Sequence, residues 1–138
     1  MTENSMAELT QKIKSMGPWH HDIHLFDDFT TGRVFSPDGK LDRPDNDGVS
    51  LISPRVRYLQ QLDQIYPDGM TGKSFLDCAC NGGGYCFWSR ERDLERGVGF
   101  DVRDHWIQQA KLVQQHRTVF PTDRLEFNVM DLYDVPKQ

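Results

Sequence analysis

The segment Phe75-Leu76-Asp77-Cys78-Ala79-Cys80-Asn81-Gly82-Gly83-Gly84-Tyr85 runs from a short apolar stretch into consecutive glycines. The stretch predicts a buried strand over residues 74–79, and the residues after the glycines predict a helix over 84–95. Glycine has no Cβ, so the backbone turns sharply there and comes close to a ligand. The N–H groups at the start of the helix would suit a carboxylate or a phosphate. We therefore expect a ligand-binding loop, although glycines alone do not identify the ligand.

The sequence on both sides of this loop alternates between strand and helix patterns. Further strands are predicted over residues 97–101 and 125–130, with a helix over 104–117 between them, and another helix begins at Ser53-Pro54. Such alternation predicts an α/β fold with a parallel sheet and right-handed crossovers. Ligands of these sheets bind at the carboxyl ends of the strands, so the residues at those ends are the first candidates for a site.

Acidic residues stand at the predicted strand ends. Asp77 precedes the glycine loop, where it would repel a pyrophosphate and attract an amino group. Asp101 ends the second strand, roughly 20 residues beyond the glycines, where a carboxylate accepts hydrogen bonds from ribose hydroxyls. S-adenosylmethionine (SAM) carries the ribose, the ammonium and the carboxylate that these features suit. Asp77 and the lack of the Gly-x-Gly-x-x-Gly order argue against a nicotinamide dinucleotide.

Three segments resemble the motifs of class I SAM-dependent methyltransferases. Residues 76–83 are similar to the first motif of that family, residues 97–101 to its second-strand motif, and residues 124–132 to its third-strand motif, whose acidic residue faces the adenine amine. The resemblance covers about residues 53–135 and implies a Rossmann-like class I methyltransferase fold that uses SAM and releases S-adenosylhomocysteine. The implied cofactor-binding residues are Asp77, Ala79, Cys80, Asn81, Gly83, Tyr85, Asp101, Val102, Asp131 and Leu132.

A narrower resemblance concerns residues 80–83, the following Tyr85, and residues 18–25 (Pro-Trp-His-His-Asp-Ile-His-Leu). These features are similar to the tRNA wobble-uridine (carboxy)methyltransferase-like proteins and their small-molecule relatives. This narrower resemblance does not fix a substrate. We expect a SAM-dependent methyltransferase with a small-molecule acceptor; tRNA modification and a non-catalytic SAM-binding half-domain that lacks the substrate half are the alternatives. The candidate substrate residues are Trp19, His20, Arg55 and Tyr58. The catalytic general base is not identified by the sequence.

The sequence departs from this family in two respects. Ala79 and Asn81 stand where the family often has glycine; alanine is tolerated if its φ is negative, and asparagine accepts a left-handed backbone, so we expect the loop to keep its shape. The family's sheet has seven strands, whereas this chain is predicted to be truncated after the third. The first strand would then expose an edge, and bare edges pair with other chains. We therefore expect a homodimer, or a partner or segment that completes the sheet.

The N-terminal part is expected to cover the site. We predict two units, residues 1–50 and a SAM-binding Rossmann-like half-domain over residues 51–138. In the first unit, a helix is predicted to begin at a capping box on Ser5, a strand to span residues 19–25, and a hairpin to return at residues 34–35, followed by a long loop.

Composition and charge limit the function further. The chain has 138 residues and a net charge of −5, which argues weakly against RNA because RNA binders need basic surfaces. Cys78, Cys80 and Cys86 are clustered and odd in number, which does not suit a disulfide framework or a zinc site, and we expect no metal. We see neither a membrane-spanning run nor a secretory signal, so we expect no membrane partner and a cytoplasmic location.

Overall fold

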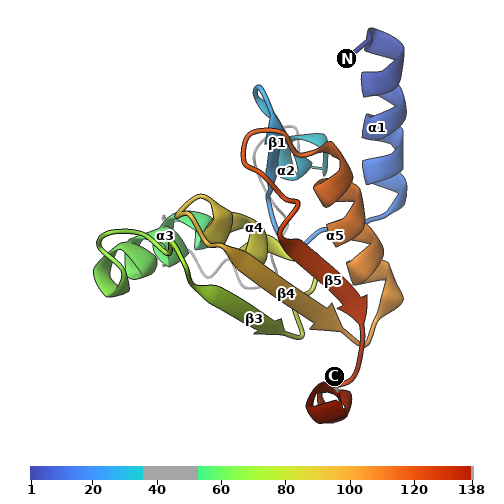
Figure 1. Cartoon of the computed structure of the whole chain (residues 1–138). Helices are drawn as coiled ribbons and strands as arrows, with labels where there is room; N and C mark the ends of the chain where they lie inside the picture. Colours follow the sequence, from blue (N-terminus) through green and yellow to red (C-terminus); the bar gives the residue numbers. More distant parts are fainter. Residues whose placement is uncertain (36–52, 138) are drawn as a thin grey trace.

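The computed structural model describes residues 1–35 and 53–137 and shows an α/β fold, as the alternating pattern predicted (Figure 1). In chain order its elements are α1 (Glu3–Ser15), β1 (His24–Phe26), β2 (Phe29–Thr30), α2 (Thr31–Phe35), α3 (Pro54–Ile65), β3 (Ser74–Cys78), α4 (Gly84–Arg90), β4 (Arg96–Asp101), α5 (Asp104–His116), β5 (Leu125–Val129) and the 3-10 helix η1 (Leu132–Lys137). The three strands predicted for the half-domain are therefore confirmed.

The central sheet is parallel, with the strand order β3-β4-β5 (Figure 1). The register pairs Asp77 with Gly99 and Asp101 with Val129, so the strands reach the same edge of the sheet together. The helices α4 and α5 connect consecutive neighbouring strands, and right-handed crossovers therefore place both helices on one face of the sheet. Within the described residues β3 has β4 on one side and no strand on the other, which is the exposed edge that we expected.

The two faces of the sheet differ in burial. Leu125 and Phe127 of β5 are buried on the face that carries α4 and α5, and Phe75 of β3 packs partly into the same core. On the opposite face Leu76 remains 49% exposed and Val98 beside it is only half-buried. Parallel sheets are normally covered on both faces. The described residues therefore leave an apolar part of one face uncovered.

The N-terminal helix starts earlier than predicted. The Oγ1 atom of Thr2 accepts a hydrogen bond from the N–H of Ser5 at 3.2 Å, so Thr2 is the capping residue and α1 begins at Glu3. Leu9 and Ile13 form the buried side of α1. The helix ends just before Gly17-Pro18, two residues that do not continue a helix.

The predicted strand over residues 19–25 is wrong for most of its length. Only β1 is a strand, and the return strand of the hairpin is β2, whereas residues 34–35 belong to the helix α2. The cause is Thr31, whose Oγ1 accepts from the Ile23 N–H and donates to the His21 carbonyl, each at 2.9 Å. A side chain thus satisfies backbone groups that a strand partner would otherwise pair.

The N-terminal segment and the parallel sheet share one hydrophobic core. Ile13, Trp19 and Ile23 pack in the same cluster as Trp88 of α4 and Val113 of α5. The predicted boundary near residue 50 lies outside the described residues, and the division into two units stays a prediction.

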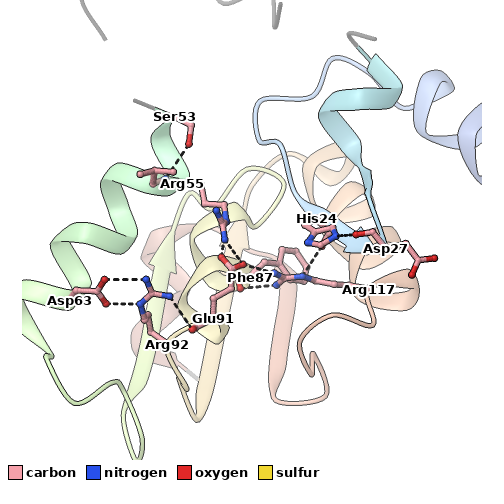
Figure 2. Close-up of polar contacts among 10 residues, drawn as sticks. His24, Asp27, Ser53, Arg55, Asp63, Phe87, Glu91, Arg92 and Arg117 are labelled. Carbon is pink, nitrogen blue, oxygen red and sulfur yellow. Dashed lines mark hydrogen bonds and ion pairs between the residues drawn. The ribbon is translucent and has the colours of Figure 1, made fainter. Parts of the chain in front are cut away.

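A buried ion-pair network joins the elements around this core (Figure 2). The Arg117 side chain donates from Nε to the His24 carbonyl at 2.9 Å and from Nη1 to the Phe87 carbonyl at 2.7 Å. Its Nη2 lies 3.7 Å from Oε1 of Glu91, which also pairs with Nη2 of Arg55 at 2.8 Å. Residues from β1, α3 and α4 are thereby tied to the end of α5.

The helix α4 is shorter than predicted and ends at Arg90 instead of residue 95. Asp93 has a left-handed backbone with a φ of 63°, and the Arg92 carbonyl accepts from the Met70 N–H at 2.7 Å. The chain therefore leaves the helix to pair with the segment before β3. Among residues 1–35 and 53–137, no helix has the length and apolar character needed to cross a membrane.

Candidate functional site

The glycine loop is shaped by three residues with a left-handed backbone. Ala79, Asn81 and Gly83 have φ values of 61°, 50° and 81°. The loop stays attached to the sheet because the Cys80 N–H donates to the Phe100 carbonyl at 2.9 Å. At Gly83 a Cβ would lie 2.7 Å from Cε1 of Phe127, so only glycine fits there. The tight, strongly bent loop that we predicted is present.

The condition under which alanine would be tolerated at no cost, a negative φ, is not met at Ala79, whose φ is 61°. A left-handed alanine brings its Cβ too close to the next carbonyl and costs about 1–2 kcal/mol. The surrounding contacts hold this strained conformation, and such strain is concentrated at functional sites.

Asp77 is the chemically unusual group beside the loop. It is the penultimate residue of β3, and its Oδ2 atom is buried without a hydrogen-bond partner among the residues that the structure describes. Burial, and then the nearby charge of Asp101, raise the pKa of Asp77 to about 6. Within residues 1–35 and 53–137, no cation or donor stabilises the charged form of this acceptor atom.

Asp101 lies at the tip of β4, next to the loop, as we expected. Its carboxylate is 1% exposed. The Oδ2 atom accepts from the Asn81 N–H at 3.1 Å, and Oδ1 accepts from the Arg103 N–H at 3.0 Å. Burial raises the pKa of Asp101, but the hydrogen bonds from Arg103 and from these two backbone groups outweigh it and hold the pKa below its usual value.

The side chain of Arg103 lies over the Asp101 carboxylate. Its Nε is 3.0 Å from Oδ1 and its Nη2 is 3.1 Å from Oδ2, while Nη2 also donates to Oδ1 of Asn81 at 3.1 Å. Its guanidinium carbon sits 5.5 Å from the centre of the Trp106 ring. Both oxygens predicted to receive ribose hydroxyls thus have partners within the chain, and a ribose would have to displace Arg103.

Two exposed apolar side chains flank the strand tips. Val102 follows β4 and Leu132 follows β5, and each is 59% exposed. The Met130 N–H donates to the Asp101 carbonyl at 3.0 Å, which holds the two tips together. Asp131 is exposed, and its Oδ1 accepts from the Tyr133 N–H at 3.0 Å. Asp131 therefore caps its own turn in this structure, and its contact with adenine stays a prediction.

An aromatic cluster borders the loop at the start of α4. The ring of Tyr85 lies 4.9 Å from Tyr58, 5.2 Å from Trp88 and 5.7 Å from His21, each edge to face. The Tyr58 hydroxyl is 2.7 Å from Oγ of Ser89. Burial raises the pKa of Tyr58 above its usual value, so this phenol is neutral near pH 7.

The other substrate candidates have contacts of their own. Trp19 is buried in the core and donates from Nε1 to the Ile13 carbonyl at 2.8 Å. Arg55 pairs with Glu91 at the far end of α4. His20 is exposed, with its ring 4.5 Å from that of Trp106. These contacts are structural, and roles in substrate binding stay predictions.

The two buried cysteine thiols are not activated. Cys78 is exposed, whereas Cys80 and Cys86 are buried. Burial raises the pKa of Cys80 to about 12 and raises that of Cys86 as well. Both buried sulfurs are therefore protonated at neutral pH and are poor nucleophiles. Among residues 1–35 and 53–137 no group of three or more His, Cys, Asp or Glu side chains is arranged to hold a metal ion.

Sequence reasoning missed three residues that touch the loop. Arg103 covers Asp101, and the His21 ring accepts from the Gly84 N–H at 3.0 Å. Gln109 of α5 approaches Gly82, where a Cβ would lie 3.1 Å from its Oε1. The position of Arg103 two residues after Asp101 is a local signal that was available. His21 and Gln109 meet the loop only through the fold.

No family model matches the chain, and no curated protein matches its sequence. Among solved structures, the chain is similar to EvdMO1, with a TM-score of 0.57 and 13% identity over 94% of this chain and 25% of that one. It is also similar to the N-terminal domain of EvdMO1 in the presence of SAH and D-fucose, with a TM-score of 0.58 and 14% identity over 98% of this chain and 48% of that one. The chain thus spans no more than about half the length of these structures, and what it shares with them is the α/β fold of an N-terminal domain.

Proposed function

We propose that the chain binds SAM at the glycine loop as part of a SAM-dependent methyltransferase with a small-molecule acceptor. The observation that carries this proposal is the buried, unpartnered Oδ2 atom of Asp77 beside a strained glycine loop. A buried acceptor without a partner costs free energy, and a ligand ammonium would offset that cost. The solved domain with a similar fold was crystallised with SAH, the product expected from SAM.

The remaining residues fit the other parts of the ligand. The Asp101 carboxylate would accept the ribose hydroxyls after Arg103 moves aside. Val102 and Leu132 offer apolar surface on adjoining strand tips, which suits a flat heterocycle such as adenine. The proposed ligand therefore accounts for the unpartnered Asp77 carboxylate and for the exposed apolar side chains at the strand tips.

SAM, when bound, supplies an electrophilic methyl group. The chain's own contribution would be to hold and orient the ligand, because alignment of two reactants alone lowers a barrier by several kcal/mol. No described residue is assigned as a general base. The half-buried Tyr58 is neutral because its pKa is raised, and its hydroxyl proton is directed to Oγ of Ser89, which itself donates to the Tyr85 carbonyl. Tyr58 is therefore not a candidate for the base.

A small-molecule acceptor is favoured over tRNA. The similar domain was crystallised with D-fucose, a small sugar. The net charge of −5 opposes the phosphate contacts on which RNA affinity depends. Binding of SAM without methyl transfer is the second candidate, because part of one sheet face is uncovered in the described structure.

Titration calorimetry with SAM and with S-adenosylhomocysteine tests the cofactor. We expect the wild type to bind both, Asp77→Asn to bind at least tenfold more weakly, and Asp101→Asn to lose a similar factor, because charged hydrogen bonds contribute about 1.5–3 kcal/mol each. Asp63→Asn is the matched control, since Asp63 is an exposed carboxylate on α3 that pairs with Arg92. If the wild type binds neither ligand, the assignment of SAM as the cofactor is refuted.

The acceptor is tested by transfer of a labelled methyl group. Wild-type protein is incubated with labelled SAM and, in separate arms, with hydroxylated small molecules including sugars, and with tRNA. Label in a small molecule supports the proposal, and label in tRNA favours the wobble-uridine alternative. Binding of SAM with no label transferred in any arm favours the non-catalytic candidate.

A further inference from the structure

His21 is the one described histidine whose ring accepts a hydrogen bond from the glycine loop. The Gly84 N–H donates to Nδ1 of His21 at 3.0 Å, across 63 residues of sequence. The ring also fills the space above this glycine, because a Cβ on Gly84 would lie 2.6 Å from Cγ of His21. The loop and the ring therefore fit each other in both shape and hydrogen bonding.

The chemistry of this contact fixes the state of the ring. A backbone N–H only donates, so Nδ1 of His21 must carry its lone pair, and in the neutral ring the proton lies on Nε2. The contact is lost if the acceptor at this place is removed or displaced by one bond length. Substitutions that move or remove the acceptor therefore distinguish a hydrogen-bonding role of His21 from a role in packing alone.

His21 is held in place from the N-terminal segment. Its carbonyl accepts from Oγ1 of Thr31 at 2.9 Å, and its ring packs edge to face against Trp88, with ring centres 5.3 Å apart. The same Thr31 side chain accepts from the Ile23 N–H. The ring position is thus set by a buried backbone arrangement and not by an exposed side chain alone.

On the loop side, the contact fixes one peptide plane. The Gly83–Gly84 peptide follows a left-handed glycine, and the carbonyl of Gly83 accepts from the Phe87 N–H at 3.1 Å. With the N–H end of this peptide bonded to His21 and its carbonyl end bonded to α4, the peptide cannot rotate. This peptide joins α4 to the loop that follows β3, the strand that carries Asp77.

We propose that His21 is a positioning residue, which through Nδ1 sets the conformation of the glycine loop and so the affinity of the site for SAM. The affinity part rests on the function proposed above, whereas the loop part does not. The N-terminal segment is then a working component of the site, although His21 itself need not touch the ligand.

Three substitutions of His21 separate the hydrogen bond from the bulk of the ring. In His21→Asn, Oδ1 stands as many bonds from the backbone as Nδ1 does, so it can accept from Gly84. In His21→Gln the acceptor lies one bond further out, and in His21→Ala there is none. We expect SAM affinity within about twofold of wild type for His21→Asn and about five- to tenfold weaker for the other two, the loss that one hydrogen bond gives.

Hydrogen exchange of the Gly84 amide, measured without ligand, is the second readout. We expect protection in wild type and His21→Asn, and faster exchange in His21→Gln and His21→Ala. His116→Asn is the matched control, because His116 bonds to the Leu112 carbonyl at the far end of α5, and it should match wild type in both measurements.

Each outcome decides the proposal. Equal losses of SAM affinity in all three variants would overturn the proposal, because they would show that only the packing of the ring matters. No loss in any variant would overturn it as well, because His21 would then have no role in binding. If the wild type fails to bind SAM, the proposed function fails, while the exchange rates still decide whether His21 holds the loop. Unchanged Gly84 exchange in His21→Ala would overturn that part as well.

Discussion

At the scale of single residues, Asp77 determines how stability should depend on pH. Its pKa is raised to about 6 in the folded protein, mainly by burial, and the unfolded value is about 3.9. The folded state therefore binds more protons between these values, so the free energy of unfolding falls as pH rises through that window. Above pH 6 the ionised carboxylate destabilises the fold by about 2 kcal/mol.

Asp77→Asn should remove this penalty. We expect the variant to be more stable than wild type at about pH 7.5 and to lose that advantage near pH 4, where the wild-type carboxyl is protonated. Urea unfolding at both pH values is the measurement. An equal effect at the two values would show that the charge of Asp77 is not the cause.

Arg103 is expected to compete with the ribose for Asp101. Arg103→Ala removes the side-chain hydrogen bonds to both carboxylate oxygens and leaves only those from the backbone N–H groups of Asn81 and residue 103. We expect SAM affinity to rise by about three- to tenfold, the factor that corresponds to about 1 kcal/mol. Calorimetry on this variant and on Arg96→Ala tests the idea, because Arg96 is an exposed arginine at the opposite end of β4. Weaker binding by Arg103→Ala would mean that the guanidinium stays and contacts the ligand.

Ala79 stores strain that a glycine would release. Ala79→Gly should raise the free energy of unfolding by about 1 kcal/mol, because a left-handed alanine costs that much more than a left-handed glycine. Thermal unfolding measures this. The reverse change at Gly83, Gly83→Ala, should destabilise the protein, since its Cβ would meet the Phe127 ring. A destabilised Ala79→Gly would contradict the strained conformation.

At the scale of elements, Arg117 joins β1, α4 and α5 from within the core. Its side chain is fully buried, and burial lowers its pKa to about 10. Arg117→Ala would leave the nearly buried Glu91 with only Arg55 as a partner, and breaking a buried pair costs about 3–5 kcal/mol. Arg55→Ala removes two hydrogen bonds to Glu91 but should cost less, because Arg55 is 41% exposed and water can take its place, while Arg117 keeps its bonds to the His24 and Phe87 carbonyls. Urea unfolding compares them, and similar losses would refute the central role of Arg117.

The sequence predicted those elements whose pattern is local. β3, β4 and α5 were found because apolar residues recur at the spacing of a strand or a helix, and Trp106 and Val113 of α5 are indeed buried. The strand over residues 19–25 failed because Thr31, a residue outside the pattern, satisfies its backbone. The predicted α4 was too long because the spacing of apolar residues does not reveal the left-handed backbone of Asp93.

The residues of the candidate site also fall into those that a local pattern predicts and those that only the tertiary fold brings together. Asp77 and Asp101 were placed at strand ends from the sequence alone, since parallel strands end at a common edge. Arg103 contacts Asn81 across 22 residues, and His21 contacts Gly84 across 63. Such pairs are decided by tertiary packing, and neither the strand pattern nor the glycine loop contains them.

At the scale of the whole molecule, the edge and face of β3 that no described residue covers should drive association. We propose that two copies associate there, and expect sedimentation velocity to show a concentration-dependent dimer. Leu76→Lys should shift the protein towards monomer, because a charge on an exposed edge opposes pairing. Val56→Lys, on an exposed position of α3, is the control. A wild type that stays monomeric at all concentrations would contradict this prediction.

The contacts between Arg117 and the N-terminal segment have a practical consequence for protein engineering. The Thr118 N–H donates to the Leu25 carbonyl at 2.8 Å, so the turn after α5 and the hairpin are hydrogen-bonded as well as packed. Anyone wishing to transplant the glycine loop and its three strands into another protein must transfer residues 19–31 with them. If the chain were cut down to the parallel sheet, the buried Arg117 guanidinium would lose its partners in the N-terminal segment and the core would be opened. The transplanted loop would also lose the His21 ring that packs on Gly84.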